Sequence, residues 1–157
     1  MPDPDWLPDL IIFDGDWHQY IEDIHNRFVE DFSRSHVMYN GCRVTAPRDP
    51  ETDGKGKTFW HCVSEGHNED ERVPELNRCS RIAWIRSIIE NSHHEQVEVW
   101  TNKRGNQKRH LLWFLEEFLV VLGEGKGYFV LITAYLTDKD HSKRKFRKER
   151  DAYNQNG

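Results

Sequence analysis

Residues Glu95–Thr137 read EQVEVWTNKRGNQKRHLLWFLEEFLVVLGEGKGYFVLITAYLT, and this stretch decides the fold of the chain. It contains four apolar runs, which are separated by turn-forming or charged residues at Arg104–Gln107, Glu116–Glu117 and Gly123–Gly127. Short apolar runs joined by tight turns are typical of antiparallel β-strands. The stretch therefore predicts a four-stranded antiparallel meander over residues 96–137.

The clearest helical pattern lies nearer the N-terminus, in DGDWHQYIEDIHNRFVEDF, residues 14–32. Its apolar residues recur at steps of three and four, which places them on one face of an α-helix. Asp14 or Asp16 can cap the start of this helix. We expect the apolar face to pack against the predicted sheet. That face consists of Trp17, Ile21, Ile24, Phe28 and Phe32.

Between these two segments the patterns are weaker. Residues 40–57 are rich in glycine, proline and aspartate, and they predict a loop with a short strand at Cys42–Ala46. The segment TFWHCVSEG, residues 58–66, predicts another short strand. After Pro74, the isoleucines at 82, 85 and 89 indicate a helical stripe.

The C-terminal segment DKDHSKRKFRKERDAY, residues 138–153, predicts a helix that is mostly exposed, because its apolar anchors are few. Together the segments predict an α+β fold in a single domain, residues 1–157. It would contain a helical N-terminal part and loop (1–57), an α+β core with the meander (58–137) and a basic C-terminal helix (138–157). The apolar anchors of the last helix are Phe146, Ala152 and Tyr153.

The composition indicates a folded cytoplasmic protein. The 157 residues include six Trp, eight Phe and five Tyr, which supply enough large side chains for a core. No apolar run approaches the ~18 residues that a membrane span needs, and the acidic start MPDPDWLPD resembles no signal or transit peptide. The three cysteines are an odd, sparse set, which favours reduced thiols over a disulfide framework.

The net charge of −5 is unevenly distributed. Residues 1–31 carry nine acidic side chains against one arginine, whereas residues 139–150 carry seven basic side chains against two acidic ones. The basic end indicates contact with the backbone of a nucleic acid. It can equally be a solvated helix, or it can dock on the chain's own acidic N-terminal segment. The candidate nucleic-acid-binding residues are His141, Lys143, Arg144, Arg147 and Lys148.

The segment FWHCVSEGHNEDER, residues 59–72, concentrates reactive side chains, so it is a metal site, a catalytic site or a solvated loop. Metal binding is disfavoured, because there is no C-x-x-C and because His61 and Cys62 would face opposite sides of a strand. The same geometry argues against Cys–His catalysis, and Cys62 and Cys79 are better explained as small buried hydrophobic residues. We expect no metal and no cofactor, although His67 adds one more potential ligand.

RNA cleavage fits these residue types better, since it requires neither a metal nor a protein nucleophile. The ribose 2′-OH attacks the phosphate, a base accepts its proton, an acid protonates the leaving oxygen, and cations hold the phosphate. Some of the arginines can instead pair with the neighbouring acids as a solvated ionic face. The candidate catalytic residues are His61, Glu65, Arg72, Arg81, Lys103, Thr133 and Tyr135.

The last strand of the meander has two different faces. Val130, Ile132, Ala134 and Leu136 alternate along it and predict the core face. The opposite face begins apolar and ends in the hydroxyl groups of residues 133, 135 and 137. It is either the floor of a cleft or the half-solvated face of an outer strand, where Thr and Tyr are favoured in any case.

The order of these elements, with YFVLITAY on the last strand, resembles the BECR superfamily of barnase-, EndoU-, colicin- and RelE-like ribonucleases and toxins. Phage-associated members are the most similar, and the resemblance covers residues ~58–137. It implies a hydrolase that cleaves RNA with a His, a basic residue and a Ser or Thr on the last strand. In this chain these would be His61, one of Arg72, Arg81 or Lys103, and Thr133.

The partners implied by the resemblance are RNA and a cognate inhibitor protein, with no membrane involved. The chain departs from the family pattern in its overall charge, because many ribonuclease toxins are basic and this chain is acidic. The alternative function is that of a non-catalytic adaptor, which keeps a BECR-like scaffold to bind a protein or nucleic-acid partner.

Overall fold

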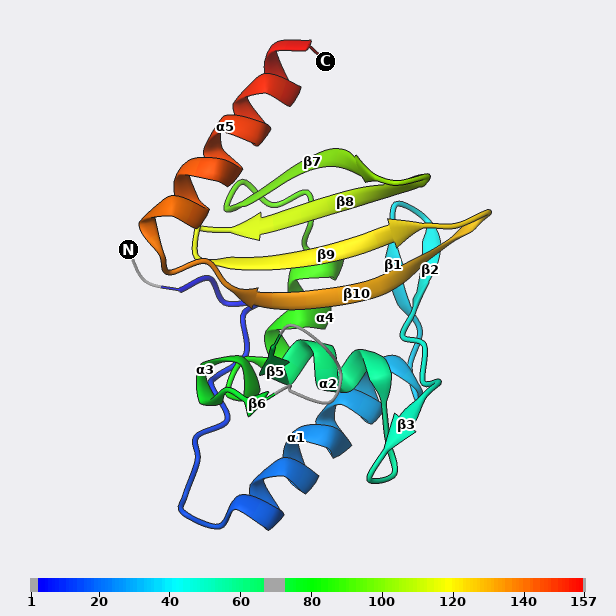
Figure 1. Ribbon diagram of the computed structural model, residues 1–157, viewed down its shortest axis with the longest axis vertical. Helices are drawn as coiled ribbons and strands as arrows, with labels where there is room; N and C mark the ends of the chain where they lie inside the picture. The colour runs from blue at the N-terminus through cyan, green and yellow to red at the C-terminus, as the bar shows by residue number, and fades with distance from the viewer. Residues whose placement is uncertain (1–2, 67–72, 157) are drawn as a thin grey trace.

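The computed structural model describes residues 3–66 and 73–156 (Figure 1). The helices are α1 (Trp17–Phe32), α2 (Lys57–Val63), α3 (Leu76–Cys79), α4 (Ile82–Glu90) and α5 (Asp140–Asn156). The longer strands are β1 (Val37–Tyr39), β2 (Cys42–Thr45), β7 (Val97–Arg104), β8 (Gln107–Phe114), β9 (Phe118–Glu124) and β10 (Tyr128–Leu136). Two small hairpins pair β3 (Glu51–Thr52) with β4 (Lys55–Gly56), and β5 (Ser64–Glu65) with β6 (Val73–Pro74).

A six-stranded mixed sheet forms the centre of the fold, in the order β1-β2-β10-β9-β8-β7. The α+β class is confirmed, and β7 to β10 pair antiparallel in sequence order. The expectation of a sheet with four strands, all antiparallel, was wrong, because β2 joins it parallel to β10. The β1–β2 hairpin turns at Asn40 and Gly41, which both have positive φ, +50° and +78°, as tight hairpin turns require.

One face of the sheet is covered by α2 and α4, and α1 packs on α4 (Figure 1). The predicted helix at Trp17–Phe32 is confirmed, and Asp16 caps it by accepting a hydrogen bond from the Gln19 amide. It was expected to lie directly on the meander. Instead α4 occupies much of that position, because it is apolar around most of its circumference. Its buried residues are Ile82, Ala83, Trp84, Ile85, Ile88 and Ile89.

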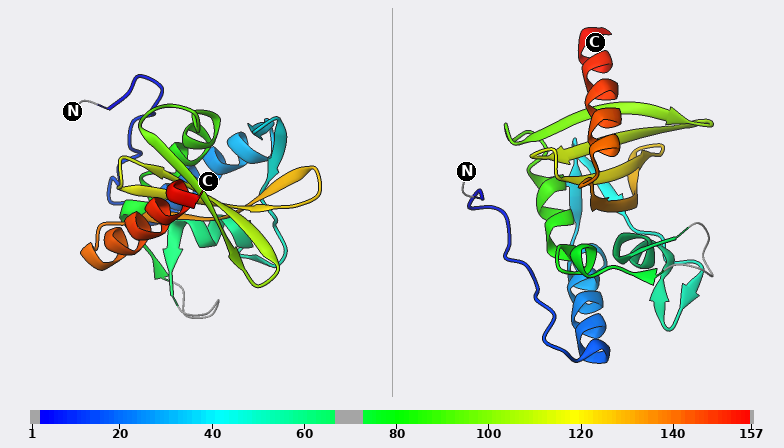
Figure 2. Two further views of the ribbon diagram at one scale, coloured as in Figure 1. Left: turned by 90° about the horizontal axis from the view of Figure 1, so that it is seen from above. Right: turned by 60° about the vertical axis from the view of Figure 1, so that its left-hand side comes forward.

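The opposite face of the sheet carries α5, which confirms the basic C-terminal helix (Figure 2). Phe146 anchors it, 6% exposed, between the indoles of Trp100 and Trp113. Arg147 and Arg150 form ion pairs with Glu116, and Arg150 also with Glu98. Among the described residues, the carboxylates that α5 meets outside its own helix therefore come from β7 and the β8–β9 turn, not from the acidic N-terminal segment.

The strand β10 contains a bulge, which changes its two faces. Its pairing with β9 shifts register between Leu131 and Thr133. As a result Phe129, Leu131 and Ala134 join the main core, while Ile132 and Tyr135 pack on the face that carries α5. The faces predicted for this strand were therefore wrong at Phe129 and Leu131, which were expected opposite the core, and at Ile132, which was expected in it. The bulge shifts the alternation, because it places two consecutive residues opposite one partner.

The segment TFWHCVSEG was predicted as a strand, but most of it is helical. Lys57–Val63 form α2, and only Ser64–Glu65 pair as a strand. Helix formation buries Phe59, Cys62 and Val63 on one side, against the sheet and α1. His61 and Cys62 are therefore not related by strand alternation.

None of the helices in residues 3–66 and 73–156 combines the length and the apolar character that crossing a lipid bilayer requires.

Candidate functional site

A hollow of about 280 Å³ lies on the sheet beside α5. We call it the Tyr135 cleft. It lies on the face that α5 covers in Figure 2, and it includes the turn end of the β7–β8 hairpin. Its polar lining residues are Asn102, Lys103, Arg104, Arg109, Tyr135, Lys145 and Glu149.

Strand pairing explains why these side chains meet. Trp100 and Leu111 are opposite each other on β7 and β8, and both are buried in the cluster around Phe146. The next pair on the same face, two residues toward the turn, is Asn102 and Arg109. A sheet face that is apolar under α5 thus becomes polar at the turn end of the hairpin.

The cleft has a strong excess of positive charge. Burial lowers the pKa of Arg109, and the nearby charge of Arg104 lowers it further. Within the described residues, neither arginine forms an ion pair, nor do Lys103 and Lys145. The Arg109 Nε atom is buried and has no hydrogen-bond partner in that part of the chain. Arg109 is half-buried, and partial burial of a cation without a counter-charge is unfavourable, so an anion bound here would offset that cost.

Tyr135 lies on the β10 side of the cleft, and its hydroxyl is able to donate a hydrogen bond. Burial raises the pKa of its hydroxyl, against the opposing influence of Arg78 and Arg104. The hydroxyl therefore stays protonated at neutral pH. The guanidinium of Arg78 lies over the ring, 5.3 Å from its centroid.

Glu149 is the carboxylate among the lining residues. Its Oε1 atom accepts hydrogen bonds from Trp100 Nε1 at 2.8 Å and from Asn102 Nδ2 at 2.6 Å. These bonds tie α5 to β7 and fix the orientation of the carboxylate. Its other oxygen, Oε2, accepts no hydrogen bond from the side chains and backbone groups that the structure describes.

Lys103 and Tyr135 are the predicted catalytic residues that line the cleft. His61 and Thr133 also meet, but through the backbone: Thr133 Oγ1 donates to the His61 carbonyl oxygen at 3.0 Å. Arg78 Nη1 donates to the same oxygen at 3.2 Å and to the Ser64 carbonyl at 2.6 Å. The Thr133 hydroxyl therefore stabilises the end of α2 in this structure.

The other predicted residues lie elsewhere. Arg81 precedes α4, where its Nη1 donates to the Asn77 carbonyl and its guanidinium lies 4.9 Å from the Trp84 ring centroid. Glu65 is exposed on β5. Arg72 lies outside the described residues. Of the seven predicted catalytic residues, Lys103 and Tyr135 therefore line the cleft.

The predicted nucleic-acid-binding residues divide into two groups. Arg147 is engaged with Glu116. The others form no ion pair with a described carboxylate, and of these only Lys143 is partly buried. They are His141, Lys143, Arg144 and Lys148.

The residues weighed as potential metal ligands do not assemble within residues 3–66 and 73–156, where no three His, Cys, Asp or Glu side chains are grouped to hold an ion. His67 lies outside those ranges. Cys62 and Cys79 are buried, as expected for small hydrophobic residues. Burial raises the pKa of the Cys79 thiol to about 12, so this residue is not a thiolate nucleophile.

Sequence reasoning missed Asn102, Arg109, Lys145 and Glu149 as site residues. The available signal was the hairpin TNKRGNQKRH, which turns at Gly105 and Asn106. Counting outward from that turn places Asn102 opposite Arg109. Nothing comparable in the sequence places the two α5 residues, because their position depends on how Phe146 docks.

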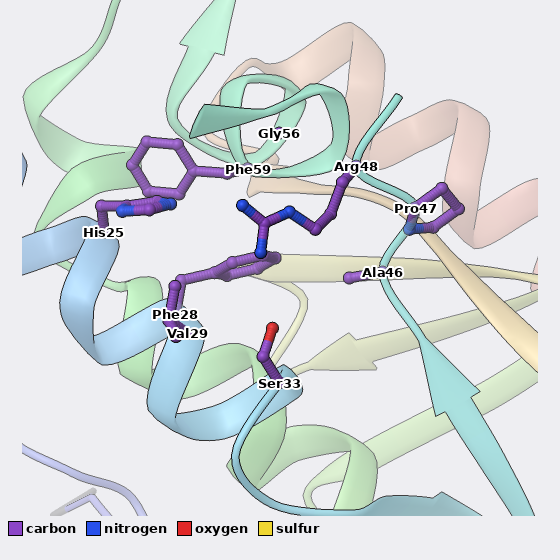
Figure 3. Close-up of a pocket in the computed structure, with 9 residues that line it drawn as sticks. All are labelled: His25, Phe28, Val29, Ser33, Ala46, Pro47, Arg48, Gly56 and Phe59. Carbon is purple, nitrogen blue, oxygen red and sulfur yellow. The ribbon is translucent and has the colours of Figure 1, made fainter. Parts of the chain in front are cut away.

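Two further hollows differ in size. One lies between α1, α2 and the segment 46–48, where Arg48 points toward the rings of Phe28 and Phe59 (Figure 3). It holds about 20 Å³, room for about one water molecule. The second, about 760 Å³, includes Trp17, Trp60 and the ion pair between Lys55 and Glu22. Neither shows the cluster of unpaired cations found at the Tyr135 cleft.

Comparisons with protein-family models, with curated proteins and with solved structures gave no match.

Proposed function

We propose that this chain is a ribonuclease that binds RNA in the Tyr135 cleft and cleaves it without a metal. The observation that carries the proposal is the group of cations in the cleft, Lys103, Arg104, Arg109 and Lys145, none paired with a described carboxylate. Phosphodiester groups are the abundant anions that such a cluster suits. The resemblance to ribonucleases in residues ~58–137 points to the same substrate.

The cleft also holds a proton acceptor and a proton donor. In the proposed reaction, the Glu149 carboxylate accepts the proton of the ribose 2′-OH as that oxygen attacks phosphorus. The bond to the 5′-oxygen breaks, and this oxygen takes a proton from the Tyr135 hydroxyl. The products are a 2′,3′-cyclic phosphate and a 5′-hydroxyl, while Arg104 and Arg109 stabilise the charge on the phosphate. The roles predicted for His61 and Thr133 stay predictions, to be tested beside these.

A second function is favoured by the hydrogen bonds of Glu149. Its Oε1 is occupied by Trp100 and Asn102, so the carboxylate has a structural task that does not require catalysis. A non-catalytic adaptor needs only the cations of the cleft to hold a nucleic acid. The two functions differ in whether bound RNA is cut.

The test is incubation of single-stranded and hairpin RNA with the purified protein in a chelator, with analysis of binding and of product ends. We expect cleavage to cyclic phosphate ends. Glu149→Gln and Tyr135→Phe should each slow cleavage by ~10²–10⁴-fold with RNA still bound, since each removes one acid–base group. Arg109→Gln should weaken binding. His61→Ala and Thr133→Ala, examined in parallel, report whether these residues take part.

The matched control is Glu95→Gln, which removes an exposed carboxylate outside the cleft and should leave cleavage unchanged. RNA that is bound by the wild-type protein but never cut would establish the adaptor instead. RNA that is neither bound nor cut would overturn both functions.

A further inference from the structure

The N-terminal end of the chain exposes a group of apolar side chains. Its members are neighbours in sequence, and Ile12 is 69% exposed. The rings of Phe13, Trp17 and Tyr20 contact one another, so the surface is partly ordered by aromatic packing. Exposed apolar side chains that gather in one part of a surface often mark an interaction site. We call it the N-terminal patch: Leu10, Ile12, Phe13 and Trp17.

Carboxylates surround the N-terminal patch. Asp9, Asp14, Asp16 and Asp23 are exposed, and none forms an ion pair with a described cation. Asp16 caps α1, and Asp23 accepts a hydrogen bond from Gln19, so both have only local neutral partners. The chemistry that fits such a surface is a basic segment with an aromatic or aliphatic side chain.

The patch also adjoins a hollow. Trp17 belongs both to the patch and to the 760 Å³ hollow, which is also lined by His18, Glu22 and Trp60. A partner that covers the patch can thus extend side chains into a recess that contains two indoles and the ion pair between Lys55 and Glu22. The faces of indole rings favour a cationic side chain.

The C-terminal helix offers the matching surface. Residues 151–156 of α5 are all exposed, Tyr153 is 42% exposed, and the helix extends beyond the sheet (Figure 1). Arg144 and Lys148 are exposed and form no ion pair with a described carboxylate. In Figure 1 the start of α1 and the end of α5 lie at opposite ends of the long axis. The two surfaces therefore meet only between molecules.

We infer that the N-terminal patch binds the α5 helix of a second copy of this chain, head to tail. Arg144 and Lys148 are four residues apart and share one side of α5. Their charged ends would face the acidic rim, and their aliphatic stems would pack on Phe13 and Trp17. The dimer keeps a free helix on one molecule and a free patch on the other, so it can extend to longer oligomers. The contact joins opposite charges in exposed positions, so it weakens as salt rises.

Two charge-reversed variants test this contact by sedimentation. The first carries Asp9→Lys, Asp14→Lys and Asp23→Lys, which leaves the Asp16 cap intact. The second carries Arg144→Glu and Lys148→Glu. We expect the wild type to associate at low salt, and each variant alone to associate at least about tenfold more weakly. An equimolar mixture of the two should associate again, because the acidic patch of one variant faces the basic helix of the other.

A second pair of variants tests the apolar part. Phe13→Ser should weaken association, whereas Met38→Ser, at another exposed apolar residue, should not. Circular dichroism checks that every variant is folded. A wild type that stays monomeric at millimolar concentration and low salt would overturn the inference, as would charge-reversed variants that associate alone as tightly as the wild type. None of these measurements involves RNA, so they are independent of the proposed ribonuclease.

Discussion

The guanidinium of Arg78 lies over the ring of Tyr135, 5.3 Å from its centroid, and joins the helical layer to the cleft. The same side chain donates to the carbonyl oxygens of His61 and Ser64, where α2 ends. One residue of α3 therefore caps α2 and also supports the residue that we propose as the acid. Stability and function are coupled at this position.

Arg78→Lys should lower the free energy of unfolding by about 2 kcal/mol, the usual range for hydrogen bonds that involve a charged donor. Lysine keeps the charge but loses the planar group that both stacks on Tyr135 and bonds the two carbonyls. Urea unfolding measures the loss. Arg43→Lys, at an exposed position on β2, is the control and should change the unfolding free energy by less than about 0.5 kcal/mol. Equal effects at both positions would contradict the role of Arg78.

Phe146→Ala should detach α5, because this side chain is the buried anchor of the helix, between Trp100 and Trp113. Replacing a buried Phe by Ala typically costs about 3–5 kcal/mol. We expect reduced helical circular dichroism together with a change in tryptophan fluorescence. Tyr153→Ala, at an exposed position of the same helix, should produce neither. A Phe146→Ala protein with unchanged helicity and fluorescence would show that the ion pairs hold α5 by themselves.

Much of the fold was predictable where the pattern is local. The stripe of Trp17–Phe32 and the interrupted apolar runs of residues 96–137 each identify an element without reference to the rest of the chain. The parallel pairing of β2 with β10 was not predictable in this way, because it joins segments about 85 residues apart, such as Val44 and Phe129. The bulge at Leu131–Thr133 is likewise set by packing on both faces of the sheet.

The candidate site was less predictable than the fold. Lys103 and Tyr135 were identified by residue type, but the cleft exists because Asn102 pairs with Arg109 and because Phe146 brings Glu149 over β7. The segment at His61 was misread because Phe59, Trp60 and Val63 have high β propensity. Burial against the sheet and α1 overrode that preference, as tertiary packing often does for short segments.

Tyr39→Phe should reduce the loss of stability at alkaline pH. Burial raises the pKa of Tyr39 from 10.0 to about 12. A group whose pKa is higher in the folded protein than in the unfolded chain stabilises the fold below its unfolded-state pKa. This stabilisation is lost as pH rises through the folded-state pKa. The unfolding free energy of the wild type should therefore fall from pH 10 to 12, and less steeply in the variant. Tyr128→Phe, at an exposed position, is the control, and an identical slope in Tyr39→Phe and wild type would contradict the prediction.

Replacing Lys143, Arg144 and Lys148 together by Gln should weaken RNA binding without changing sequence preference, because phosphate contacts carry no sequence information. For single-stranded RNA, the slope of log affinity against log salt should decrease by about 0.7 for every phosphate that is no longer neutralised. A salt titration of the binding constant measures this slope. An unchanged slope, in a variant that is folded by circular dichroism, would show that these side chains do not touch the phosphates.

Arg147→Gln should instead alter the response of the fold to acid, because Arg147 donates two hydrogen bonds to Glu116. The hydrogen bond from Arg147, with a further one from Arg150, holds the pKa of Glu116 below its ordinary value of 4.5. A carboxylate with a lowered folded-state pKa stabilises the fold above its unfolded-state pKa. This stabilisation is lost as pH falls through the folded-state pKa. Arg147→Gln should therefore lower the urea midpoint at neutral pH, and the variant should lose less stability on acidification than the wild type.

In a Glu116→Gln background the Arg147→Gln change should have little further effect, since the partner carboxylate is gone. If Arg147→Gln lowers the midpoint equally with and without Glu116, the pair does not hold α5, and Arg147 rejoins the cations available to RNA.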